Sequence, residues 1–170
     1  SLPSLNVQQT FTRDIAPTLA DDAETHGVKI SNRLTSDVNV QMQPEELQQI
    51  LTTTVQNAIQ FSTSGGSVVV GSEAGRSKST LIVQDEGQGI APEAQQHLFE
   101  PLTRGVDTAT FDHEGLGLNL FITRMILQKH GGDIHITSKP QQGTEVTMTM
   151  PNSGRVATGI ATQVINPSAP

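Results

Sequence analysis

Two glycine-rich stretches of the sequence carry the residue types that could bind a nucleotide. In DEGQGI (85–90), Asp85 stands two residues before Gly87, and Gly89 follows. Glycines let a backbone approach a flat ligand closely, and a carboxylate can accept a hydrogen bond from an amine such as that of adenine. A tight turn at the end of a strand would also account for these glycines, because short glycine motifs often match by chance.

The second stretch, EGLGLNLFITR (114–124), opens a predicted helix. Backbone N–H groups at a helix N-terminus beside glycines can bind an anion. The segment between the two stretches contains Arg104, which is either a phosphate-binding cation or an exposed loop charge. Together, the stretches predict an amine-recognising acid and a phosphate site joined by a loop.

A third polar feature lies on the predicted helix 44–61. Its residues Thr53, Gln56, Asn57 and Gln60 fall on one stripe by their spacing of three and four. A solvated helix side is the simpler interpretation of this stripe taken alone. Beside two glycine stretches, it also indicates that Asn57 binds Mg²⁺ or phosphate.

Several common sites are excluded by the sequence. A dinucleotide fingerprint needs a third glycine at position 92, where the chain has Pro92. The P-loop string GxxxxGK[ST] does not occur, and neither do the strings HRD and DFG of eukaryotic-type kinases. The chain has no cysteine, and its five histidines form no HExxH pattern, so neither a disulfide nor a zinc site is expected.

Composition narrows the class of protein further. The chain has 10 Lys and Arg against 17 Asp and Glu, a net charge of −7, which argues against a general binder of nucleic acid or anionic membranes. No apolar run approaches the ~20 residues of a membrane span, and no signal peptide opens the chain. We therefore expect a cytoplasmic piece without direct membrane contact. The start at Ser1 indicates a piece of a longer protein, and whether that parent protein is membrane-anchored stays open.

The elements that must position these residues follow from periodicity and turn signals. A weak helical pattern covers Asn6 to Leu19 and is broken at Pro17, and residues 101–117 have no periodicity and are expected to form a mobile loop. The predicted fold is an α+β two-layer sandwich, in which a mixed, largely antiparallel sheet of about five strands carries helices on one face. The predicted strands are 28–34, 67–72, 79–84, 133–138 and 144–150, and the other helices are 44–61, 92–99 and 118–130.

In their order and spacing, five motifs resemble the GHKL ATPases, and within them the catalytic ATP-binding domain of bacterial sensor histidine kinases. LQQILTTTVQNAIQFS is similar to the N box, DEGQGI to the first glycine box, and LFEPLTRG to the F box. GLGLNLFI resembles the second glycine box, and HGGDIHITS with GTEVTMTMP resembles the end of the last helix and the final hairpin. The resemblance implies a Bergerat-type ATP-binding fold over residues 28–151.

The resemblance also implies the roles of individual residues. Asn57 would ligate Mg²⁺, and Asp85 would accept a hydrogen bond from the adenine amine. Asn57, Gln60 and Arg104 stand at the positions that serve phosphoryl transfer. The remaining residues expected to bind ATP are Phe61, Gly87, Gly89, Ile90, Phe99, Gly115, Leu116, Gly117, Leu118, Asn119 and Thr144.

Departures from the family pattern gather on the phosphate and metal side. Thr53 replaces an Asn or acid four residues before Asn57, and Gln60 replaces a Lys that reaches phosphate. Asn119 stands where the second glycine box has its third glycine, and Leu116 where it has Ser or Thr. The adenine side keeps the family pattern. We therefore expect nucleotide binding more firmly than efficient phosphoryl transfer.

The implied function is transfer of the ATP γ-phosphoryl group to a histidine on a separate dimerisation domain, with a response regulator downstream. No H-[DE]-x-x-x-P string occurs, so neither His113 nor His130 is expected to be the phosphoacceptor. Residues 1–27 are interpreted as a stub towards the dimerisation domain, and 152–170 as a linker-like tail. Two alternatives stay open: a degenerate nucleotide-binding regulatory module, and an anti-sigma serine kinase, which the HGG string and final hairpin disfavour.

Overall fold

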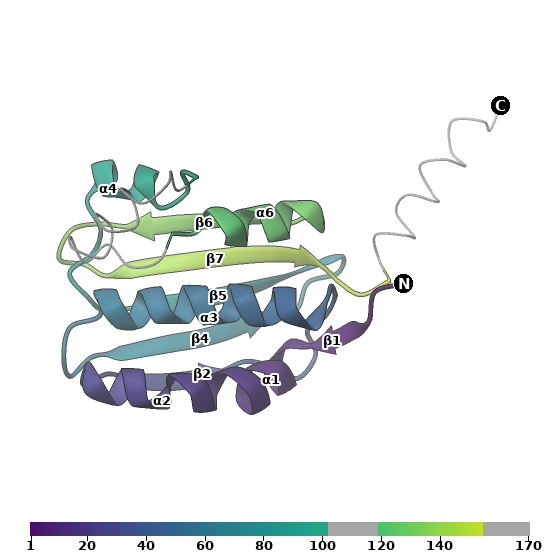
Figure 1. The fold of residues 1–170 in the computed structure, drawn as a ribbon, viewed down its shortest axis with the longest axis horizontal. Coiled ribbons are helices and arrows are strands. Elements are labelled where there is room, and N and C mark those ends of the chain that lie inside the picture. The colour runs from purple at the N-terminus through teal and green to yellow at the C-terminus, as the bar shows by residue number, and fades with distance from the viewer. Residues whose placement is uncertain (102–118, 155–170) are drawn as a thin grey trace.

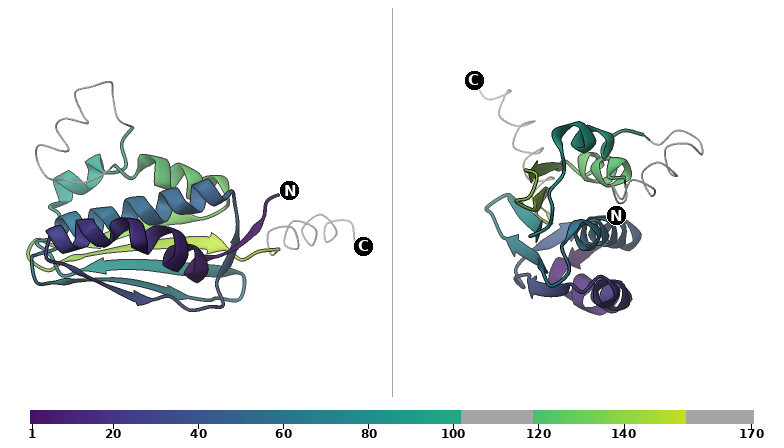
Figure 2. Two further views of the ribbon diagram at one scale, coloured as in Figure 1. Left: turned by 60° about the horizontal axis from the view of Figure 1, so that its bottom comes forward. Right: turned by 90° about the vertical axis from the view of Figure 1, so that its left-hand side faces the viewer.

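The computed structural model describes residues 1–101 and 119–154. They form two layers, a five-stranded sheet and a layer of helices that covers one face of it (Figures 1 and 2). The predicted α+β sandwich with helices on one face is therefore confirmed. None of the helices in the described part of the chain is long and apolar enough to cross a membrane.

The main sheet has the strand order β2-β4-β5-β7-β6. The β2–β4 pair is parallel, while the other neighbours are antiparallel, as expected for a mixed sheet. A second sheet of two short strands, β1 and β3, was not predicted, because three-residue strands carry too little periodicity. The strands are β1 (Ser4–Asn6), β2 (Lys29–Arg33), β3 (Asn39–Gln41), β4 (Ser67–Glu73), β5 (Lys78–Asp85), β6 (Asp133–Ser138) and β7 (Thr144–Pro151).

The central helix, α3 (Pro44–Phe61), has the predicted bounds. Pro44 starts it, and a capping box closes its first turn: the Glu46 carboxylate accepts the Gln43 backbone N–H at 3.0 Å. Leu47, Ile50 and the other apolar residues of its predicted face are buried against the sheet. The other helices are α1 (Val7–Thr10), η1 (Phe11–Ile15), α2 (Ala16–Thr25), α4 (Pro92–His97) and α6 (Phe121–Lys129).

The N-terminal helical run differs from the prediction of a helix from Asn6 to Leu19 broken at Pro17. Helical structure continues to Thr25, and the irregularity is the π-helical turn η1, just before Pro17 in the first turn of α2. Apolar residues recur here every fourth position, a period that drifts around a 3.6-residue helix, and a wider turn corrects the drift. The buried residues of this series are Val7, Phe11, Ile15, Leu19 and Ala23, and they share one core with α3.

The two ends of the main sheet carry different residues. Asp85 ends β5 and lies opposite Thr144, which begins β7, while Lys78 lies opposite Pro151 at the far end. Helix α3 runs from Pro44, near the Pro151 end, to Phe61, whose carbonyl oxygen lies 3.4 Å from the backbone nitrogen of Gln88. The predicted chemistry of Asp85, Gly87 and Thr144 is thus concentrated at one end of the domain.

Candidate nucleotide site

The carboxylate of Asp85 is the central group of this end of the domain. As the last residue of β5, Asp85 is only 3% exposed. Its Oδ1 accepts the backbone N–H of Gly87 at 2.9 Å. A buried carboxylate is costly unless its oxygens receive hydrogen bonds, so the glycine turn that follows β5 also supports the acid.

Burial raises the pKa of Asp85 to about 6, and hydrogen bonds from the backbone N–H groups of Gly87 and Thr144 oppose the rise. The carboxylate is therefore mainly ionised at neutral pH but close to its titration range. An ionised carboxylate only accepts hydrogen bonds. Asp85 can consequently select a ligand that offers an N–H donor.

Close backbone packing explains the glycines of DEGQGI. A Cβ added to Gly87 would lie 1.8 Å from the Phe61 carbonyl oxygen and 2.9 Å from Oδ1 of Asp85. A Cβ on Gly89, which has φ +74°, would lie 2.0 Å from the Lys139 carbonyl oxygen. The turn therefore packs between the end of α3 and the β6–β7 hairpin, and any side chain at either position would displace backbone.

Ser138 is a site residue that the sequence analysis missed. Its hydroxyl accepts the backbone N–H of Ile90 at 2.8 Å, donates to the Gly143 carbonyl oxygen at 3.0 Å, and lies 2.8 Å from the hydroxyl of Thr144. Ser138 thus joins the glycine turn to the β6–β7 hairpin. No sequence signal marks Ser138; the strand register of the structure places it opposite Thr144, which pairs with Asp85.

The same end of the sheet has a hollow of about 250 Å³. Asp85 and Thr144 line it together with Ser138, Gly143 and Gln142. Phe61, Gly87 and Ile90 are not among the described residues that line this hollow. The hydrogen bonds and strand pairing, and not the hollow, join Asp85, Gly87, Ile90 and Thr144 into one group of contacts. Gly143, with φ +83°, belongs to this group too, because its added Cβ would lie 2.3 Å from the Asp85 carbonyl oxygen.

On α3, the polar stripe is largely buried. Asn57 is 4% and Thr53 5% exposed, so a solvated helix side is the wrong interpretation for these two residues. The Thr53 hydroxyl accepts the side-chain amide of Gln49 at 3.2 Å. Gln60 is exposed, and Phe61, 4% exposed, contributes its carbonyl oxygen to the glycine turn.

Asn57 is the residue on which a metal site would depend. Among the described residues, no group of three or more His, Asp or Glu side chains could hold a metal ion. Mg²⁺ needs few protein ligands when substrate phosphates complete its shell. The amide oxygen of Asn57 is of the right chemical type for such a site.

Where the chain leaves α4 and enters α6, Asn119 ties the two ends together. Its amide donates to the carbonyl oxygens of His97 at 3.1 Å and Glu100 at 2.7 Å, and its Oδ1 accepts the Phe121 N–H at 2.8 Å. The guanidinium carbon of Arg124 lies over the ring of half-buried Phe99, 5.0 Å from the ring centroid. The remaining predicted site residues, Arg104, Gly115, Leu116, Gly117 and Leu118, lie outside the described residues.

The raised pKa of Asp85 predicts an unusual pH dependence of stability. The folded state keeps the Asp85 proton up to about pH 6, whereas the unfolded chain loses it near pH 3.8. Because the native state then binds more protons between these values, the free energy of unfolding should fall as pH rises from about 4 to 6, by about 2–3 kcal/mol. Urea unfolding of the wild type and Asp85→Asn at each pH measures the difference.

The expected result is that Asp85→Asn removes this decline. The window from pH 5 to 6 separates it from Glu46, because the pKa of Glu46 is lowered from 4.5 to about 2 and its contribution is largely complete by pH 5. Parallel pH profiles for the two proteins would show that Asp85 titrates normally.

For Ser138, we expect Ser138→Ala to lower the free energy of unfolding by about 1–3 kcal/mol, because the N–H of Ile90 loses its acceptor in a partly buried place. Urea denaturation measures the change. Thr137→Ala is the matched control, because Thr137 is the exposed neighbour on the same strand. Equal losses in both variants would contradict the bridging role.

Comparison with known proteins supplies an independent line of evidence. Residues 42–154 match the family described as histidine kinase-, DNA gyrase B-, and HSP90-like ATPases. An uncharacterised sensor-like histidine kinase of Rhizobium meliloti (strain 1021) is 33% identical over 135 residues, covering 79% of this chain and 26% of the relative. The chain thus spans about a quarter of the length of that relative.

Solved structures resemble the fold. The nucleotide-free catalytic domain of histidine kinase ThkA superposes with a TM-score of 0.73 at 22% identity, covering 89% of this chain and 96% of that one. Full-length ShkA in complex with AMPPNP gives 0.72 at 24% identity, covering 89% of this chain and 31% of that one. These similarities establish that the two-layer architecture is shared.

Proposed function

The chain belongs to the histidine kinase-, DNA gyrase B-, and HSP90-like ATPase family, and from this we propose that it is the ATP-binding catalytic domain of a sensor histidine kinase. The observation that carries the proposal is the buried Asp85 carboxylate, held by a glycine turn at the end of α3. One of its sequence relatives is an uncharacterised sensor-like histidine kinase. The proposed reaction transfers the ATP γ-phosphoryl group to a histidine of a separate dimerisation domain.

Recognition of adenine is the better supported half of the proposal. Asp85 would accept the exocyclic amine of the base, while Phe61, Gly87, Gly89, Ile90 and Thr144 would surround it. The contacts of Gly87 and Gly89 hold the turn against Phe61 and Lys139, which keeps the N–H of Gly87 beside the carboxylate of Asp85. ShkA, which shares the fold, is known in complex with the ATP analogue AMPPNP.

The phosphate half depends on Asn57 and on residues near the second glycine stretch. Asn57 would give its amide oxygen to Mg²⁺, which neutralises phosphate charge when bound. Arg104 would contact the phosphates, and Gly115, Leu116, Gly117, Leu118 and Asn119 would lie beside them. Because phosphoryl transfer needs little covalent help from the protein, these residues would act by positioning and charge stabilisation.

The partners follow from the same proposal. The dimerisation domain would supply the phosphoacceptor histidine, and a response regulator would receive the phosphoryl group downstream. We propose that residues 1–27 connect to that domain, that 28–151 form the catalytic unit, and that the domain works in the cytoplasm. The N-terminal segment shares its core with α3, so a connection through it would be mechanically coupled to the ATP site.

A regulatory module without efficient transfer is the second candidate. The relatives do not favour it, but three residues of the phosphate side keep it open. Thr53 is engaged with Gln49, Gln60 is exposed and uncharged, and Asn119 is held by the end of α4. None of the three supplies the charge or the glycine that the family pattern has there. This module would bind ATP and respond to it without phosphorylating histidine.

Calorimetry tests the binding step. ATP should bind with a dissociation constant below millimolar in the presence of Mg²⁺, and Asn57→Ala should reduce the gain that Mg²⁺ gives. Absence of binding with and without Mg²⁺ would overturn both candidate functions.

Phosphotransfer separates the two candidates. The chain is mixed with the dimerisation domain of its own kinase and γ-labelled ATP, and label on histidine is measured. Label transfer supports the kinase, whereas ATP binding without transfer supports the regulatory module.

A further inference from the structure

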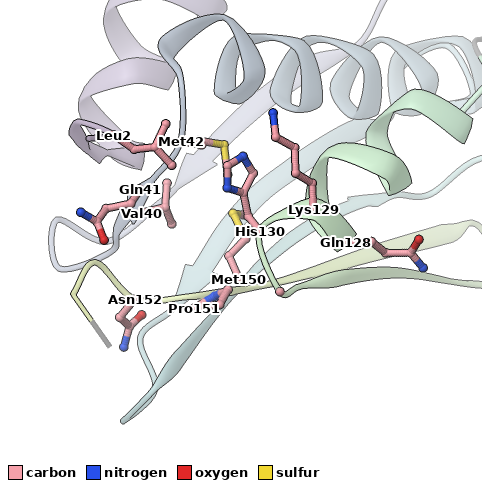
Figure 3. Close-up of a pocket in the computed structure, with 11 residues that line it drawn as sticks. Leu2, Val40, Gln41, Met42, Gln128, Lys129, His130, Met150, Pro151 and Asn152 are labelled. Carbon is pink, nitrogen blue, oxygen red and sulfur yellow. The ribbon is translucent and has the colours of Figure 1, made fainter. Parts of the chain in front are cut away.

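A second concave site lies at the end of the domain opposite Asp85. It is a groove of about 610 Å³ between β3, the C-terminal end of α6 and the end of β7 (Figure 3). Val40, Met42 and Met150, each 1% exposed, form its floor. Leu2, an exposed large apolar residue at 36%, stands on one side, with His130 and Pro151 on the other.

The polar side of this groove is joined to α3 by two contacts. His130 Nε2 lies 2.9 Å from Oε1 of Glu46, and Lys129 Nζ lies 2.9 Å from Oε2 of the same carboxylate. These contacts join the end of α6 to the start of α3. The floor therefore belongs to the core, and the polar side is held by two contacts to the Glu46 carboxylate.

The described chain leaves at the rim of this groove. The N–H of Ser153 donates to the Asn39 carbonyl oxygen at 3.0 Å, and the N–H of Gly154 donates to Oε1 of Gln41 at 3.0 Å. Gln41 and Asn152 are themselves groove residues. Residues 155–170 consequently start from a fixed point beside the groove.

The sequence of that C-terminal segment suits an apolar groove. Val156, Ile160 and Val164 recur every fourth residue, which is the spacing of one face of a helix. Ala157 and Ala161 border this face, while Thr158, Thr162 and Ile165 fall on the other side. Arg155 is the one ionisable side chain from 155 to 170, so docking of the apolar face would bury no charged side chain.

We propose that residues 156–165 dock in the groove of their own chain, with Val156, Ile160 and Val164 facing Leu2 and the methionine floor. Ten helical residues span about 15 Å, and tethering at Gly154 gives the segment a high effective concentration. Methionine adapts its shape to an apolar partner. The docked segment would cover Leu2, on the side of the domain away from the nucleotide site.

Cysteine pairing tests the docking, since the chain has no cysteine of its own. Gln128→Cys, on the groove, is combined with Ala161→Cys, and the rate of disulfide formation is measured in dilute protein. Adding Ile160→Asp should slow the intramolecular disulfide by about tenfold, because a charge opposes apolar burial. The matched charge at Thr162→Asp, off the apolar face, should leave the rate within about twofold.

Each other outcome overturns the proposal. Equal rates with Ile160→Asp and Thr162→Asp would mean that the tether alone brings the cysteines together. A disulfide only between molecules would assign the groove to a second copy, and no disulfide would leave the segment undocked. As a second measurement, ending the chain at Gly154 should raise binding of an apolar fluorescent dye, and unchanged dye binding would also contradict docking.

Discussion

Replacing Asp85 with Asn is expected to weaken ATP binding by about 10- to 150-fold, the range of one hydrogen bond to a charged group. Asn has one amide oxygen, which the N–H of Gly87 already occupies in the wild type through Oδ1. The NH₂ group of Asn would then face the adenine amine, donor against donor. Calorimetric titration with ATP and GTP measures both the loss of affinity and the loss of preference for adenine.

Stability provides the internal control for this prediction. Because the charged form of Asp85 is disfavoured by burial, Asp85→Asn should be at least as stable as the wild type at pH 7. Asp21→Asn is the matched surface control, because Asp21 is exposed on α2. Unchanged ATP affinity in Asp85→Asn would refute the role given to the carboxylate, and lower stability would refute the description of its burial.

Substitution of Gly89 by Ala is expected to lower the free energy of unfolding by about 3 kcal/mol or more and to abolish ATP binding. Two costs add at this position: a left-handed backbone, with φ +74°, and a Cβ that would lie 2.0 Å from the Lys139 carbonyl oxygen. Relief requires the glycine turn to move away from the hairpin, which would also move Gly87 and the donor to Asp85.

Substitution of Gly65 separates the cost of a left-handed backbone from the cost of a steric clash. Gly65 has φ +89°, but an added Cβ would meet nothing within 4 Å. Gly65→Ala should therefore cost only about 1–2 kcal/mol, the penalty for a left-handed residue, and should leave ATP binding intact. Urea unfolding compares the two variants, and a similar loss in both would mean that close packing at Gly89 contributes little.

Much of the fold could be predicted from the sequence, because helices and strands leave patterns in neighbouring residues. Helix α3 was predicted with its observed bounds, since Pro44, the acids after it and a long apolar face define both its start and its orientation. The strands of the main sheet followed from alternation between glycine-rich turns. The β1–β3 pair and the π-helical turn could not be predicted in this way, because each depends on packing between segments that are distant in the chain.

The sequence indicated some residues of the candidate site, and only the structure showed the others. Asp85, Gly87 and Gly89 stood out by residue type and spacing, yet the sequence left a simple turn as an equal explanation. Only the packing of Gly87 on Phe61 and of Gly89 on Lys139 gives those glycines a steric reason. Ser138 had no motif of its own and became visible only through its contacts with Ile90, Gly143 and Thr144.

By itself, the sequence determined the family resemblance, the two-layer class and the glycine turn that follows Asp85, because periodicity and glycine spacing are properties of neighbouring residues. The tertiary structure decided how deeply Asp85 and Asn57 are buried and which backbone groups support the acid. It also brought Leu2, Met42, His130 and Met150 around one groove. These features depend on the register of β5 against β7 and on the placement of α3 and α6, which arise when distant segments pack together.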